Sequence, residues 1–201
     1  GSGFYQQFHQ GGNDGFYGNH GFHGTYSEKG ENLEAEISLT FDEAAFGCDK
    51  MITLQEADGN RTLKVHIPAG IDTGQSVRLR GKGHPGIGGG EPGDLLLRAK
   101  VGTKPGYERK GADVYTTVNI PYTTAALGGE ARVSTLYGDV SCKIKEGTQS
   151  GSKIRLRGKG IVSMKNPNVH GDQYVTVQIQ VPRHLNQQAR RKLMEYKQAC
   201  G

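Results

Sequence analysis

Residues 81–86 read Gly-Lys-Gly-His-Pro-Gly and reproduce the G-x-G-x-x-G spacing of dinucleotide-binding loops. That chemistry needs a helix directly after the glycines, because the phosphates bind at the N-terminus of the helix. The residues that follow, Pro85 to Gly90, consist mostly of proline and glycine and cannot begin a helix. A second copy, at residues 158–163, lacks the third glycine. We interpret these glycines as turn residues and expect no cofactor.

The cysteines and histidines do not form the patterns of a metal or catalytic site. Cys48, Cys142 and Cys200 are widely spaced and form no C-x-x-C pair. Thiolate zinc sites use such pairs, so we expect no metal. No Ser/His/Asp or Cys/His spacing suggests an activated nucleophile, and we expect a protein that is not an enzyme. Unpaired cysteines are typical of reduced thiols, which predicts a cytoplasmic location.

Two short runs alternate basic with apolar residues and place their cations on one face of a strand. These cations are Arg78, Arg80, Lys82, Arg155, Arg157 and Lys159. Contacts from such a face to phosphates would bind nucleic acid, but no aromatic residue interleaves with the cations to stack on bases. The net charge of +5 permits acidic partners without requiring nucleic acid. A solvated sheet face is the favoured interpretation, and nucleic-acid binding stays open as the alternative.

The elements that must position these residues occur twice. Residues 78–83, Arg-Leu-Arg-Gly-Lys-Gly, recur at 155–160. The block 41–47 parallels 122–128, and Gly-Asp at 93–94 parallels Gly-Asp at 171–172. A near-constant separation of about 80 residues across three blocks indicates duplicated domains, and two copies are too few for a solenoid. We predict two sister domains in tandem.

Alternation of apolar and polar residues predicts that both domains are β. Ala35, Ile37 and Leu39 recur at every second position, and Asp58-Gly59-Asn60 gives a hairpin signal. The predicted fold class is mainly β: two tandem sandwich-like domains of antiparallel strands, each with a short helix, and a C-terminal helix. The predicted boundaries are 1–32 for a flexible Gly/Phe-rich linker, 33–108 and 109–183 for the β domains, and 184–201 for the helix. No apolar run is long enough to span a membrane.

Two apolar sets leave alternatives open. Ala35, Ile37 and Leu39 would lie near Ile52 and Leu54 of the next strand, either as core of the small domain or as part of an exposed groove. The C-terminal helix, predicted from Asn186 to about Gln198, carries a stripe at three- and four-residue steps. This stripe consists of Leu185, Ala189, Leu193 and Tyr196. So short a helix is marginal alone in water, so the stripe needs the second domain or another chain.

An ordered series of motifs resembles the C-terminal part of DnaJ-type co-chaperones over essentially the whole chain. The series is a Gly/Phe-rich segment, 39–47, 67–70, 80–83 and 93–96, and then 113–115, 120–121, 126–129, 171–172 and 182–186. The J-domain with its His-Pro-Asp motif is missing, and we expect that the sequence begins after it. The zinc-binding Cys-x-x-Cys-x-Gly-x-Gly repeats are also missing. The chain is therefore similar to the zinc-free branch, which includes curved-DNA-binding paralogues.

The resemblance implies a site for each partner. An apolar groove of the first β domain would bind unfolded polypeptide clients through Ile37, Leu39, Ile52, Leu54 and Tyr107. A basic rim would meet acidic tails through Lys50, Arg61 and Lys64. The C-terminal helix, with Leu185, Ala189, Leu193 and Tyr196, would form a homodimer.

The implied function is that of a non-enzymatic co-chaperone fragment that passes clients to a DnaK-type chaperone. The alternative is a nucleic-acid-binding β module that uses the basic strands. The aromatic residues of the Gly/Phe-rich segment are additionally hypothesised to compete with clients for the groove.

Overall fold

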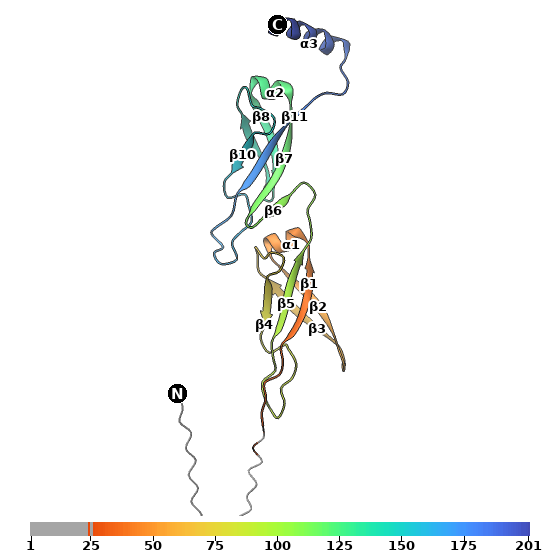
Figure 1. Ribbon diagram of the computed structural model, residues 1–201, viewed down its shortest axis with the longest axis vertical. Helices are drawn as coiled ribbons and strands as arrows, with labels where there is room; N and C mark the ends of the chain where they lie inside the picture. Colours follow the sequence, from red (N-terminus) through yellow and green to blue (C-terminus); the bar gives the residue numbers. More distant parts are fainter. Residues whose placement is uncertain (1–23, 25) are drawn as a thin grey trace, which may run out of the picture.

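A computed structural model describes residue 24 and residues 26–201 of the chain. It consists of two β domains stacked along the long axis, with a helix beyond the second domain (Figure 1). The mainly β fold class is confirmed. None of the helices in the described part of the chain is long and apolar enough to cross a membrane.

The first domain packs a three-stranded sheet against a hairpin. The sheet has the order β1 (Leu33–Leu39), β5 (Leu95–Val101), β4 (Ser76–Leu79). The hairpin consists of β2 (Cys48–Glu56) and β3 (Gly59–Ile67). β1 pairs with β5 in parallel, and only β4 runs antiparallel to β5. The expectation of antiparallel strands throughout was therefore wrong for the central pair, because alternation assigns faces of a strand but not its partner.

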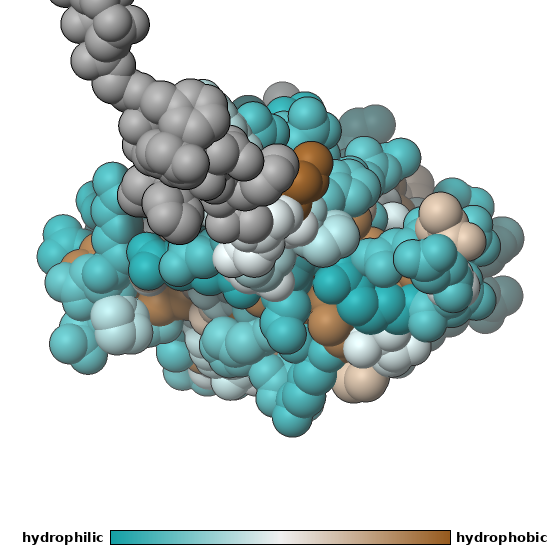
Figure 2. All heavy atoms as spheres, turned by 90° about the horizontal axis from the view of Figure 1, so that it is seen from below, coloured by the Kyte–Doolittle hydropathy of each residue, from teal (hydrophilic) through white to brown (hydrophobic). Residues whose placement is uncertain are grey.

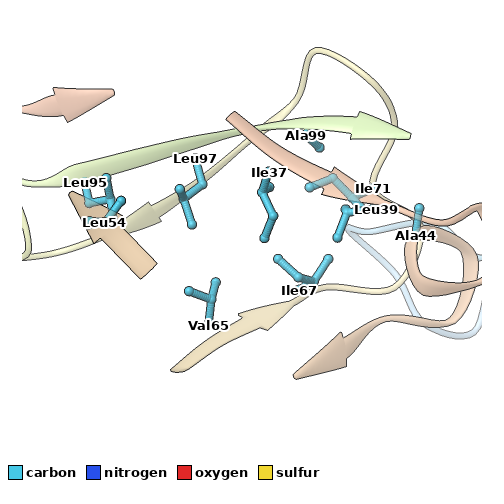
Figure 3. Packing of buried hydrophobic residues seen from close by; sticks show 10 residues of the cluster. All are labelled: Ile37, Leu39, Ala44, Leu54, Val65, Ile67, Ile71, Leu95, Leu97 and Ala99. Carbon is cyan, nitrogen blue, oxygen red and sulfur yellow. The ribbon is translucent and has the colours of Figure 1, made fainter. Parts of the chain in front are cut away.

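The core of the first domain lies between the sheet and the hairpin. Figure 3 shows side chains from both layers pointing toward one another. β1 enters this core with the predicted alternation, since its buried residues Ile37 and Leu39 are separated by the exposed Ser38. The short helix α1 (Phe41–Phe46) follows β1 directly. A reciprocal capping box between Thr40 and Glu43 starts this helix, and Gly47 at a φ of 73° ends it.

The second domain repeats this plan with one additional strand. Its sheet has the order β10 (Lys153–Leu156), β11 (Gln173–Gln180), β7 (Asp113–Pro121), β6 (Glu108–Lys110). β7 and β11 pair in parallel, as β1 and β5 do. The hairpin is β8 (Gly129–Thr135) with β9 (Gly138–Ile144), and the short helix is α2 (Tyr122–Leu127).

The duplicated Arg-Leu-Arg-Gly motif forms the same hydrogen-bonded contact with an aspartate in each domain. We call this contact the aspartate lock. In the first domain, the Asp94 carboxylate accepts hydrogen bonds from Nε of Arg78 at 2.6 Å and from the backbone N–H of Gly81 at 2.9 Å. In the second, Asp172 accepts the equivalent bonds from Arg155 and Gly158 at 2.7 and 2.9 Å. The lock ties the turn after the motif strand to the start of the neighbouring strand.

The two domains meet through an apolar cluster and one arginine. Phe41 and Ala45 of α1 pack with Val114 and Ile161 of the second domain. The guanidinium of Arg109, on β6, donates to the carbonyl oxygens of Gly70 and Ile71 of the first domain at 2.8 and 2.6 Å. Its side chain is only 10% exposed. This junction consists of specific, largely buried contacts rather than of a loose linker.

The C-terminal helix α3 (Gln187–Cys200) begins at Asn186, whose side chain accepts a hydrogen bond from the N–H of Ala189 at 2.7 Å. The predicted N-cap is confirmed. No residue of this helix is buried. Figure 1 shows it displaced from the second domain at the end of a connecting segment.

Candidate functional site

The apolar residues predicted for a groove fall into two different clusters. Ile37, Leu39 and Leu54 are 4%, 3% and 9% exposed and belong to the core shown in Figure 3. Ile52 packs against this cluster and is half-buried. Tyr107 lies elsewhere, at the domain junction, where its ring centroid is 6.2 Å from that of Phe41. The structure thus brings four of the five predicted residues together and separates Tyr107 from them.

Between β1 and β2, half-buried residues lie beside the core of the first domain. β1 is the edge strand of its sheet, and β2 pairs only with β3 among the described strands. Each strand therefore keeps one edge without a strand partner. Ile52 of β2 and Ala35 of β1 are half-buried residues beside the core cluster. We refer to this region between β1 and β2 as the seam.

Two of the predicted basic residues lie at the margins of the hairpin. Nζ of Lys50 donates to the carbonyl oxygen of Ser38 at 2.8 Å and to Glu43 at 3.2 Å, so it crosses from β2 to β1. The backbone hydrogen bond from Thr40, with help from Lys50, lowers the pKa of the Glu43 carboxyl. Arg61, on β3, forms an ion pair with Glu56 at 2.7 Å.

Lys64 lies on the other face of the hairpin. It is exposed and forms an ion pair with Asp49 at 3.5 Å, whereas Lys50 and Arg61 are at the inward-facing positions of β2 and β3. Successive side chains along a strand alternate between its two faces. Lys64 is three residues from Arg61 on β3, so the two side chains lie on opposite faces of the hairpin. The three cations therefore do not form one continuous rim.

The corresponding region of the second domain combines a buried apolar cluster with a buried glutamine. Val133 of β8, the equivalent of Ile52, is only 3% exposed. Gln173, the equivalent of Leu95, is fully buried, and its amide nitrogen donates to Thr116 at 2.9 Å and to the Ser134 carbonyl at 3.0 Å. Comparison of the two sequence copies could have found this difference, since Gly-Asp is followed by Leu95 in one and Gln173 in the other.

A second apolar region lies between α2 and α3. A hollow of about 760 Å³ is bounded mainly by apolar side chains of these helices and of the segment that connects β11 to α3. The hydroxyl groups of Tyr122 and Tyr196 are hydrogen-bonded at 2.5 Å across it. All four residues predicted for dimerisation line the hollow, namely Leu185, Ala189, Leu193 and Tyr196.

The comparisons with known proteins decide the family. Residues 33–182 match the family model of the DnaJ C terminal domain. The chain belongs to the DnaJ C-terminal domain family. It is 45% identical over 139 residues to a chaperone protein DnaJ of Lachnospira eligens, covering 69% of this chain and 37% of the relative.

Two further DnaJ relatives agree with this assignment. The chain is 43% identical over 157 residues to a chaperone protein DnaJ of Clostridium botulinum, covering 76% of this chain and 42% of the relative. It is 47% identical over 141 residues to that of Burkholderia thailandensis, covering 70% and 37%. The chain thus spans about two-fifths of the length of the curated relatives it matches. The resemblance noted from the motifs is confirmed.

Within this DnaJ C-terminal fold, the basic strands are partly neutralised. Arg78 and Arg155 are each bound to an aspartate of the duplicated lock. No aromatic residue interleaves with these cations along their own strands, but sheet pairing places Tyr174 of β11 opposite Arg155. Tyr174 stacks on Tyr115 at 5.2 Å, and Lys110 lies 4.8 Å from the centroid of the Tyr115 ring. These rings are in contact with protein groups, which leaves little ring surface for a base.

The cysteines of this DnaJ C-terminal fold are free thiols. Burial, with the nearby Glu43 carboxylate, raises the pKa of Cys48, and burial also raises the pKa of Cys142. Residues 24 and 26–201 contain no group of three or more His, Cys, Asp or Glu side chains that could hold a metal ion. The histidines His9, His20 and His23 lie outside the described residues, as do Phe4, Phe8, Phe16 and Phe22, the aromatic residues predicted to compete with clients.

Proposed function

We propose that this chain is the client-binding and dimerising part of a zinc-free J-domain co-chaperone of the cytoplasm. The seam of the first domain would hold an extended apolar segment of an unfolded client. The client would then pass to a DnaK-type chaperone. The observation that carries the proposal is the difference between the two sister domains: the first has a half-buried isoleucine beside an apolar core, where the second has a buried valine and a polar network.

The chemistry of the seam suits an extended peptide. A client strand can pair with the backbone of a strand edge while its apolar side chains approach Ile52 and the core residues below, Ile37 and Leu54. Each buried apolar anchor contributes roughly 1.5–3 kcal/mol before the ordering of the client is subtracted. Two or three anchors therefore contribute at most about 9 kcal/mol before that subtraction, so the affinity should be about 1 μM or weaker, which is weak enough for release to a second chaperone.

Lys50, beside the seam, and Arg61, on β3 where it donates to the carbonyl oxygen of Lys82, have a proposed role in binding acidic groups. An acidic tail of a partner chaperone would replace the intrachain partners Glu43 and Glu56. Because these ion pairs are partly solvent-exposed, exchanging one carboxylate for another costs little. Lys64 would add only long-range attraction, since it lies on the other face of the hairpin.

Matched substitutions in the two domains test the proposal. Ile52→Ser should weaken the binding of an apolar peptide about tenfold or more, measured by fluorescence anisotropy, because an anchor of roughly 1.5 kcal/mol is lost. Val133→Ser, at the equivalent but buried position, should leave peptide affinity unchanged and lower the free energy of unfolding by roughly 2 kcal/mol. Unchanged peptide affinity in Ile52→Ser, with a large loss of stability, would show that Ile52 is core and would end the groove assignment.

A further inference from the structure

Residues 26–31 run along the glycine-rich loop that connects β4 to β5. Glu28 and Ile87 exchange two backbone hydrogen bonds, with N···O distances of 3.0 and 2.9 Å. The N–H of Gly30 donates to the carbonyl of Glu91 at 2.8 Å, and the N–H of His84 donates to that of Glu31 at 3.0 Å. This run of backbone bonds is what holds an added strand in a sheet.

Three glycines of the loop and its end, Gly88, Gly90 and Gly93, are required by this contact. A methyl group built on Gly88 would overlap the carbonyl oxygen of Tyr26, and one on Gly90 would overlap that of Glu28. A methyl group on Gly93 would overlap the carbonyl oxygen of Glu31. The loop thus touches the segment backbone against backbone, an approach that only glycine allows.

The second domain has one of these backbone hydrogen bonds but not the others, so the comparison shows which part of the contact is specific to the first domain. There the N–H of Ile161 donates to the carbonyl of Ala112 at 2.7 Å, just before β7. The loop that follows Ile161 has no glycine until residue 171, and it approaches the first domain at Gly70 instead. The additional glycines of the first loop, at positions 86, 88, 89 and 90, therefore accompany a contact with residues 26–30, whereas the equivalent residues 107–111 of the second domain include β6, which pairs with β7.

Side chains contribute little to the contact. Tyr26 and Ile87 are 85% and 68% exposed, and residues 27–29 are exposed as well. The part of this end face that is visible in Figure 2 is mainly hydrophilic, with small separate hydrophobic patches. Recognition in this contact therefore depends on backbone shape and hydrogen bonding rather than on apolar burial.

We propose that the loop from His84 to Glu91 is a docking site for residues 26–30 of the same chain. The docked segment is a fixed, extended part of the first domain that is joined to the loop by an isolated β-bridge between Glu28 and Ile87, so the domain begins near residue 26 rather than at 33. The site binds an extended backbone, and it requires Gly88 and Gly90 in the loop because a side chain at either position would collide with the bound segment. The docked segment lies at the end of the molecule remote from α3 (Figure 1). This inference is independent of the proposed client binding.

Trypsin tests the docking directly, because Lys29-Gly30 lies in the docked segment. A protease binds its substrate through free backbone groups, and the N–H groups of Glu28 and Gly30 are already bonded to the loop. Cleavage after Lys29 in the intact chain should therefore be at least about tenfold slower than in a synthetic peptide of residues 24–33. Gly90→Ala should remove the protection. Gly102→Ala is the matched control, since Gly102 also lies in a loop and a methyl group there meets only an ordinary contact at 3.5 Å. The control should cleave like the unmodified chain.

Amide hydrogen exchange separates undocking from unfolding. In Gly90→Ala, the amides of Glu28 and Gly30 should lose protection while those of β1 and β5 keep it. Glu28→Pro removes a donor of the ladder without changing the loop or the core, and it should also expose Gly30. Ser27→Pro, at a position without a ladder hydrogen bond, should leave Gly30 protected. Cleavage of the unmodified chain at the rate of the peptide, or protection of Gly30 that survives Glu28→Pro, would overturn the proposal.

Discussion

At the scale of single residues, the duplicated aspartates are more informative than the cations around them. The pKa of Asp94 is lowered, first by the N–H of Gly81 and then by Arg78, and the pKa of Asp172 is lowered in the same way by Gly158 and Arg155. The charge of the Arg-Leu-Arg-Gly motif is thus partly used inside each domain. This internal use explains why a basic strand face need not have a nucleic-acid partner.

The aspartate lock predicts how stability depends on pH. A carboxyl whose pKa is lower in the folded state stabilises the fold above its unfolded pKa of about 3.9, and this contribution is lost as pH falls through the folded value. Asp94→Asn should lower the thermal midpoint at pH 7 and flatten its decrease between about pH 4 and pH 2. Asp58→Asn, on the exposed hairpin turn, is the control and should keep the profile of the unmodified chain. Identical profiles for all three proteins would rule out the lock as a source of stability.

The polar network of the second domain predicts that swapping equivalent residues between the domains lowers stability more in the first domain than in the second. Leu95→Gln would bury an amide in the first domain, where Ala35 stands in place of the hydroxyl-bearing Thr116, and should cost about 3 kcal/mol. The double change Gln173→Leu with Thr116→Ala copies the first domain and removes a buried amide oxygen that has no hydrogen-bond partner. It should cost less than about 1 kcal/mol. Chemical denaturation measures both, and equal costs would contradict this account of the asymmetry.

At the scale of elements, the sequence predicts which face of a strand or helix is buried better than it predicts which strands pair with each other. Alternation correctly places Ile37 and Leu39 on an inward face, and the helix stripe with its Asn186 cap correctly predicts α3. Nothing in the residues of β1 shows that its partner is β5, more than fifty residues later, because parallel pairing depends on the whole chain path.

The same limit applies to the candidate site. The motifs brought Ile52 and Leu54 to attention, but only the packing of the hairpin on the sheet shows that one is half-buried and the other is core. The polar bond from Lys50 to the Ser38 carbonyl also had no signal in the sequence, since it joins strands of different sheets.

The junction strand β6 gives a prediction at this scale. Arg109 donates to three backbone carbonyls, those of Gly70, Ile71 and Gly111, and burial lowers its pKa. Arg109→Ala leaves buried acceptors without donors and should cost roughly 2–4 kcal/mol. Because the lost bonds join the domains, calorimetry should show one unfolding transition dividing into two.

The control for the junction is another arginine of the second domain. Arg132 is 80% exposed and bound only to Asp139, so Arg132→Ala should change stability by less than about 0.5 kcal/mol. A single transition at an unchanged midpoint in Arg109→Ala would mean that the other junction contacts, which include the apolar cluster and the Phe46–Tyr137 ring pair, are enough to hold the domains together.

At the scale of the whole molecule, the tandem arrangement leaves one end uncovered. The helix α1 is covered by the second domain, and its Phe41 is 6% exposed. The equivalent residue of α2, Tyr122, is 42% exposed and faces the hollow beside α3. A surface that is covered in one copy of the domain and open in the other indicates that another protein surface packs against it. We propose that this surface belongs to a second copy of this chain.

The proposed dimer gives the last prediction. Leu193 and Tyr196 are 45% and 46% exposed although they form the apolar stripe of α3, and a helix of this length is marginal without a packing partner. Leu193→Glu, or deletion of residues 186–201, should therefore give a monomer in sedimentation velocity while circular dichroism shows both β domains folded. Gln188→Glu adds the same charge to an exposed position outside the hollow and should leave the dimer intact. An intact chain that sediments as a monomer at about 50 μM, where even weak interfaces of self-association are populated, would show that α3 packs only on its own second domain.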